Sequence, residues 1–100
     1  MIACNPKAIR ASDRPRYEAL IEKLRAAVRE RGSQQDGYAY KLDSGGISLQ
    51  EVAEWINMER LCCPFLTLQL SVGGDQEDWL LTLTGPVGVK ALLGAEFPAQ

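Results

Sequence analysis

Residues 47–72 read ISLQEVAEWINMERLCCPFLTLQLSV and contain the strongest structural signals of the chain. Ser48 and Glu51 have the spacing of a capping box, in which each side chain bonds the other residue's backbone N–H at the start of a helix. Pro64 disfavours helical geometry in the residue before it. The sequence therefore predicts a helix that begins at Ser48 and ends near Cys62.

One face of this helix is expected to be buried. Its members are regularly spaced apolar residues: Leu49, Val52, Ala53 and Ile56. Trp55 and Met58 are expected on the flank of that face, where they would pack in the core or at a dimer interface rather than form a ligand site.

Further strands are predicted on both sides of the helix. In residues 66–72 and again in residues 79–84, apolar residues alternate with mostly polar ones, which is the period of a strand with one buried face. The polar segment 73–78 is expected to be the turn between them. Residues 38–42 predict another strand, which follows a turn at residues 36–37.

A helix is also predicted near the N-terminus. Ser12 or Asp13 can cap it, and its apolar stripe extends from Tyr17 to Val28. Gly32 supplies the signal that ends it.

The last helix is predicted to open at Gly85-Pro86, because proline is tolerated in the first turn of a helix. The residues expected to face inward from it are Val87, Ala91 and Leu92 or Leu93.

These elements predict an α+β fold with the order α-β-α-β-β-α. A strand–helix–strand crossover followed by a hairpin gives a small three-stranded mixed sheet, with residues 79–84 between the other two strands and helices on one face. A chain of 100 residues is expected to form one domain, residues 1–100, in which residues 1–11 are an irregular lead-in.

The composition excludes several classes of protein. The hydrophobic share is 46% and the charged share 24%, as in ordinary globular domains, and histidine is absent. Without histidine there is no Ser-His-Asp or Cys-His arrangement and no histidine-ligated zinc site. No paired groups point to catalysis, so we assign no catalytic residue and lean towards a non-enzymatic role. Neither haem nor a nucleotide is expected as a cofactor.

The sequence also bears on location and partners. No apolar run approaches the roughly 20 residues of a membrane span, and the first residues lack the apolar segment of a secretory signal. We therefore expect a cytoplasmic protein without membrane contact. Residues 1–31 carry eight Lys or Arg and four Asp or Glu, whereas residues 32–100 carry three and nine. We attribute this asymmetry to charge pairs along a solvated helix rather than to nucleic-acid binding.

Cys62 and Cys63 are neighbours and form the chemically distinctive pair of the chain. A disulfide between them would be strained, and a total of three cysteines argues against a disulfide framework. Two thiolates this close can share a thiophilic ion. Cys4 would complete a three-thiolate site if the lead-in folds across the helix end. Such a site suits arsenite or mercuric ion, and it suits zinc only with a fourth ligand. Glu59 could supply that ligand or a supporting contact.

Other interpretations of these residues stay open. The cysteines could pack in the core of a structural or interaction module that forms a homodimer through the polar sheet face or the Trp55 flank. They could also belong to a thiol redox protein, although a helix C-terminus and the charge of Glu59 both oppose thiolate formation. A bound cation would remove that penalty. Glu59 could equally be a surface carboxylate or a partner of Arg60.

The chain resembles a group of small uncharacterised bacterial proteins that carry an E-R-x-C-C-P-F motif. The resemblance lies in residues 59–65 (ERLCCPF), residues 83–90 (LTGPVGVK), residues 36–39 (DGYA) and the early Cys4, so it covers most of the chain. Members of this group often occur near heavy-metal and arsenic resistance genes. The resemblance implies that Cys4 and the residues of the motif belong together, and it implies no particular activity.

Overall fold

The computed structural model describes residues 4–74 and 78–97. Its helices are α1 (Arg14–Ala27), α2 (Leu49–Cys62) and α3 (Val89–Glu96), and its strands are β1 (Val28–Gln34), β2 (Gly37–Leu42), β3 (Thr67–Ser71) and β4 (Trp79–Thr84). Two short 3-10 turns, η1 (Pro6–Ala8) and η2 (Ala11–Asp13), precede α1. The α+β class is therefore confirmed.

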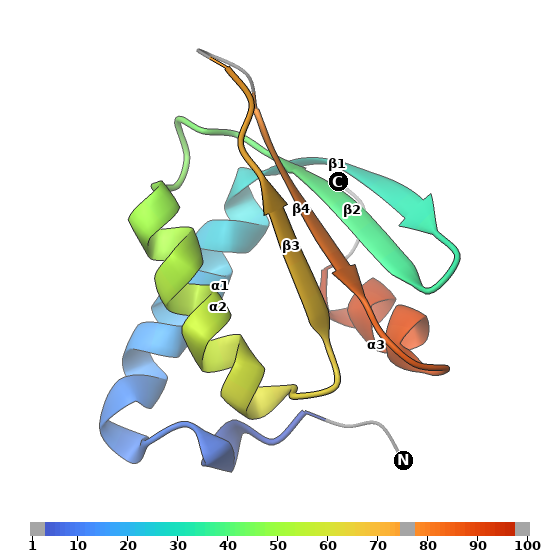
Figure 1. Cartoon of the computed structure of the whole chain (residues 1–100). Helices are drawn as coiled ribbons and strands as arrows, with labels where there is room; N and C mark the ends of the chain where they lie inside the picture. Colours follow the sequence, from blue (N-terminus) through green and yellow to red (C-terminus); the bar gives the residue numbers. More distant parts are fainter. Residues whose placement is uncertain (1–3, 75–77, 98–100) are drawn as a thin grey trace.

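The strands of the described residues form one sheet in the order β1-β2-β4-β3, and each neighbouring pair is antiparallel (Figure 1). The expected three-stranded mixed sheet and the expected element order α-β-α-β-β-α are therefore wrong. The difference is β1, which occupies a segment expected to be the end of the first helix.

The chain leaves the helical conformation at Ala27 rather than near Gly32, because the residues that follow pair with β2. Gln34 pairs with Gly37 across a two-residue turn, the commonest hairpin connection. Val28 is buried at the start of β1. It therefore continues the apolar stripe of α1 without being helical, and the stripe alone could not reveal where the helix ends.

The three helices lie on the same side of the sheet (Figure 1). Phe97, which follows α3, joins the layers: its ring centroid lies 5.4 Å from that of Tyr40 on β2 and 5.9 Å from that of Trp55 on α2. The core between the helices and the sheet includes Leu20, Leu24, Leu42, Val52, Leu81, Leu83, Val89 and Leu93.

The boundaries of α2 agree with the prediction. Ser48 Oγ accepts a hydrogen bond from the Glu51 N–H (3.1 Å), and the Glu51 carboxylate accepts one from the Ser48 N–H (3.0 Å). The helix ends at Cys62, before Pro64. Both signals are local, and the tertiary contacts of α2 leave them in place.

The buried face of α2 differs from the prediction. Its buried residues are Val52, Trp55, Glu59 and Cys62. Leu49 and Ala53, which were expected on this face, are exposed. Trp55 is completely buried, so it packs in the core, one of the two expected outcomes, and offers no exposed side chain to a dimer interface. The helix turns its largest aromatic side chain to the core, because tryptophan buries more area than leucine or alanine.

The last helix begins later than predicted. Gly88 is the N-cap of α3, and its φ of 103° lies in the left-handed region that favours glycine. Val87 and Ala91 do not face inward as expected: Val87 is 98% exposed, and Ala91 is exposed as well. Val89 and Leu93 are the buried residues of α3.

Arg25 pairs with Glu22 along α1 (3.0 Å), the local kind of charge pair that the sequence predicted, whereas two other cations of α1 pair with acids of α2. Arg16 on α1 forms an ion pair with Glu54 on α2 (2.9 Å), and Lys23 forms one with Glu51 (2.8 Å). These contacts fasten the two helices to each other at their exposed edges.

Three further expectations concern a membrane span, the turn at residues 73–78 and the lead-in. No helix within residues 4–74 and 78–97 is both long enough and apolar enough to cross a membrane. The turn expected at residues 73–78 includes residues 75–77, and the lead-in includes residues 1–3. These residues lie outside the description.

Candidate metal centre

The candidate site lies where the N-terminal segment crosses the C-terminal end of α2. Cys62 is the last residue of α2, and Cys63 caps it by donating its N–H to the Glu59 carbonyl oxygen (2.7 Å). The Asn5 N–H donates to the Cys62 carbonyl oxygen (2.8 Å). A helix end leaves such carbonyls without an intrahelical partner, and the N-terminal segment supplies one. This contact places Cys4 beside the two cysteines at the end of α2.

Four groups that can ligate a metal converge at this point. The Sγ atoms of Cys4, Cys62 and Cys63 and a carboxylate oxygen of Glu59 all lie within 4.8 Å of one another. Cys4 is half-buried and the other three residues are buried. The structure thus brings together every residue that the sequence suggested as a metal ligand, including the distant Cys4.

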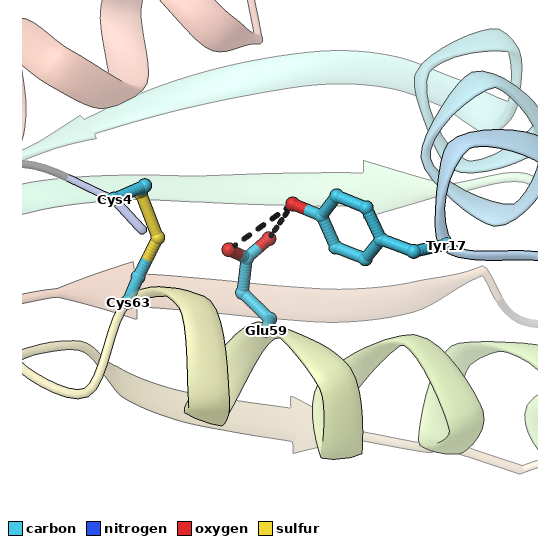
Figure 2. The surroundings of a disulfide bond; sticks show 4 residues. All are labelled: Cys4, Tyr17, Glu59 and Cys63. Carbon is cyan, nitrogen blue, oxygen red and sulfur yellow. Dashed lines mark hydrogen bonds between the residues drawn. A yellow bond between two sulfur atoms is a disulfide. The ribbon is translucent and has the colours of Figure 1, made fainter. Parts of the chain in front are cut away.

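Cys4 and Cys63 are joined in a disulfide, with their Cα atoms 4.7 Å apart (Figure 2). The odd number of cysteines argued against a disulfide framework, and the Cys4–Cys63 bond corrects that expectation. The third cysteine, Cys62, is a free and buried thiol. The N-terminal segment offers Cys63 a partner at ordinary disulfide distance, so the strained bond between sequence neighbours is avoided.

Glu59 is a buried carboxylate at 1% exposure, and among the described residues no other acidic or basic residue is buried. The Tyr17 hydroxyl of α1 donates to this carboxylate, at 3.2 and 3.4 Å from its two oxygens. Figure 2 shows the carboxylate directed at the Tyr17 hydroxyl, beside the disulfide. The interpretation of Glu59 as a surface carboxylate or a partner of Arg60 is therefore wrong.

Burial controls the proton equilibria of the site. Loss of water raises the pKa of Glu59 to about 7, with a smaller contribution from the charge of Glu96, against the opposing effects of Tyr17 and Arg25. The pKa of the Cys62 thiol is raised, first by burial and then by the charge of Glu59. Cys62 is therefore a protonated thiol at neutral pH and a poor nucleophile. The charge of Glu59 opposes the thiolate as the sequence suggested, but burial is the main cause.

Tyr17 is the residue of the site that sequence reasoning missed. It was assigned to the apolar stripe of the first helix, and its side chain is indeed buried. Burial and the Glu59 charge raise the pKa of its hydroxyl, which therefore stays a proton donor. No sequence signal separates a tyrosine that only packs from one that serves a buried acid, because the pairing depends on how α1 crosses α2.

The donor set depends on the state of the sulfur atoms. With the disulfide formed, the cluster offers the Cys62 thiol and the Glu59 carboxylate. After reduction it would offer three thiols and a carboxylate, a sulfur-rich set of the kind that selects thiophilic metals over hard cations.

Comparisons of the chain with protein-family models, with curated proteins and with solved structures found no match in any of the three. The resemblance to small bacterial proteins with the E-R-x-C-C-P-F motif therefore stays a prediction. Function is inferred below from the geometry and chemistry of the site.

Proposed function

We propose that the reduced protein binds a thiophilic metal or metalloid ion through Cys4, Cys62 and Cys63, with Glu59 as a fourth ligand or a supporting contact. The observation that supports this proposal is the convergence of three sulfur atoms and one carboxylate within 4.8 Å. The role that follows is sequestration, delivery or sensing of the ion.

The charge balance of a buried site favours some ions over others. Three thiolates neutralise a trivalent metalloid, and a neutral complex costs least to bury. Three thiolates and a carboxylate around a divalent zinc ion would leave two negative charges in the interior. We therefore expect the preference for arsenite over zinc to be larger at this buried site than in an exposed three-thiolate peptide.

The test is a titration of the reduced protein with arsenite, mercuric ion and zinc, followed by thiolate-to-metal absorbance and calorimetry. Cys62→Ser removes one ligand at the end of α2 and should weaken arsenite binding by about 100-fold or more. Leu61→Ser is the matched control, because Leu61 is the exposed neighbour of Cys62 on the same helix turn. Equal titrations of the wild type and Cys62→Ser would contradict the proposal.

The second candidate is a structural module in which the cysteines hold the fold together. The observation that favours it is that Cys62 and Cys63 belong to the hydrophobic core. The disulfide spans a sequence separation of 59, and a bond of this kind typically stabilises a protein by about 2–4 kcal/mol. The structural module is supported if the reduced protein binds none of the three ions and is less stable than the oxidised protein by this amount. Sedimentation equilibrium would test its homodimer, whose remaining candidate interface is the polar sheet face.

A further inference from the structure

We propose that the Cys4–Cys63 disulfide is a redox latch on the metal centre, which excludes the ion when it is formed and admits it when it is reduced. This inference rests on the proposed function and adds its control. Its basis is that the two sulfur atoms joined by the disulfide are two of the three in the ligand cluster.

The first argument is the number of donors. A sulfur atom in a disulfide has no thiolate to offer, and the thiolate is the form that binds metals. The oxidised cluster therefore keeps only Cys62 and Glu59, both of them buried. Two such donors are too few for a structural zinc site, which takes four ligands. Oxidation thus dismantles the site rather than adjusting its affinity.

The second argument is the placement of the segment that carries Cys4. Residues 5–8 are exposed, and Ile9 is the first buried residue after Cys4. Ile9 packs in the hydrophobic core and anchors the segment. Reduction would release Cys4 from Cys63 but leave it on a short tether beside Ile9. A short tether keeps the effective concentration of the third thiol high, so the opened site can still close around an ion.

The third argument is access for a reductant. Cys4 is the half-buried cysteine of the three, whereas Cys62 and Cys63 are buried. A thiolate of an external dithiol would attack Cys4 Sγ, the Cys4–Cys63 bond would break, and Cys63 would leave and take up a proton. The second thiolate of the dithiol would then attack the mixed disulfide and release Cys4. The dithiol leaves as a disulfide, so two electrons have passed to the protein.

Ion binding and reduction are then linked thermodynamically. An ion that binds only the reduced form stabilises that form and makes the disulfide easier to reduce. The midpoint potential of the Cys4–Cys63 couple should rise by about 30 mV for each tenfold increase of free ion above its dissociation constant. A disulfide that only braces the fold would have a potential independent of the ion.

The experiment compares the full-length protein in its two redox states. Calorimetric titration with zinc and with arsenite is performed on the oxidised protein, verified by mass, and on protein reduced with a phosphine that is then removed. In parallel, thiol labelling across a series of dithiol redox buffers gives the midpoint potential with buffered free zinc and with a chelator. Cys62→Ser is the control variant, because it keeps both partners of the disulfide but lacks the third thiol.

We expect binding to the reduced form, affinity at least about 100-fold weaker in the oxidised form, and a potential that rises with zinc in the wild type and much less in Cys62→Ser. Two outcomes would overturn the latch and leave the proposed function standing. One is equal binding of the ion to both forms, and the other is a midpoint potential that does not change with zinc although the reduced protein binds zinc. If neither the reduced nor the oxidised protein binds an ion, the proposed function is overturned and the latch with it.

Discussion

Tyr17 on α1 and Glu59 on α2 are joined by a hydrogen bond, at 3.2 Å from the hydroxyl to the nearer carboxylate oxygen, inside the interface of the two helices. A buried carboxylate needs a donor, because an unpaired charge in the interior is costly. Tyr17 provides that donor and fixes the carboxylate beside Cys62 and the disulfide. The contact thus links the packing of α1 on α2 to the electrostatics of the candidate metal centre.

The metal-free protein should lose stability as the pH rises from about 4.5 to 7. The pKa of Glu59 is about 7 in the folded protein and 4.5 ordinarily, so in this window the folded state keeps a proton that the unfolded state has released. This stabilisation is complete below pH 4.5 and is lost through pH 7, with a total on the order of 3 kcal/mol. Urea unfolding in the presence of a chelator, at half-unit steps of pH, measures it.

Two variants identify the group responsible for this pH dependence. Glu59→Gln should flatten most of the slope, and Glu18→Gln, at an exposed position of α1, should keep it. The pKa of Glu96 is also raised by burial, so this residue adds to the same pH dependence of stability. The slope of Glu59→Gln is therefore compared with that of Glu18→Gln and is not expected to be zero. An unchanged slope in Glu59→Gln would show that the carboxylate is not buried as described.

Removal of the Tyr17 hydroxyl should destabilise the protein, and the loss should depend on Glu59. Tyr17→Phe leaves the buried carboxylate without its donor, which costs about 1–3 kcal/mol. The loss should be larger at pH 8, where Glu59 is charged, than at pH 5. A double-mutant cycle with Glu59→Gln, measured by urea unfolding at both pH values, gives the coupling between the two residues. Additive effects at pH 8 would argue against the hydrogen bond.

The helix that carries the site could be delimited from the sequence, but its buried face could not. The capping box at Ser48 and the stop before Pro64 depend on neighbouring residues only. The buried face includes Glu59, a carboxylate in the middle of an otherwise apolar stripe, and this residue masks the periodicity. Sequence rules fail most readily where a residue violates the local pattern, and here that residue, Glu59, belongs to the candidate metal centre.

The gathering of the ligand set was predictable in outline. The adjacent cysteines and Glu59 share a helix end, and only the reach of Cys4 required the fold. The disulfide between Cys4 and Cys63 could not be predicted, because three cysteines allow several pairings and the choice depends on distances that the N-terminal segment sets. The pairing of Tyr17 with Glu59 could not be predicted either, because it depends on how α1 packs against α2.

Strand β1 was not predicted, because the turn at residues 36–37 was interpreted only as the start of the next strand. The turn before β2 requires a partner strand on its N-terminal side, and the charged residues of that segment gave no strand periodicity. The pairing of β2 with its other neighbour, β4, can be tested at Gly37, where a Cβ atom would collide with the Leu83 carbonyl and with Thr84 of β4. Gly37→Ala should therefore cost about 2 kcal/mol or more.

Gly32→Ala is the matched control for this substitution. Gly32 lies in β1 of the same hairpin, and the nearest atom to its Cβ would be the Ala39 carbonyl oxygen at 3.8 Å, an ordinary contact. Its effect on the free energy of unfolding should be within about 0.5 kcal/mol. Comparable losses in the two variants, measured by urea unfolding, would contradict the close approach of β2 to β4.

Cys62 should react slowly with alkylating reagents in the native oxidised protein. It is buried, and its pKa is raised, so both access and the thiolate fraction are low. At pH 7 the reaction with iodoacetamide, followed by mass spectrometry, should be about 100-fold slower than in urea-unfolded protein, because it requires local opening of the helix end. The rate should increase with pH beyond the range of an ordinary thiol, whose pKa is about 8.5. Cys62→Ser should show no labelling at all while oxidised, and labelling of the native wild type as fast as that of the unfolded chain would contradict the buried thiol on which the metal centre depends.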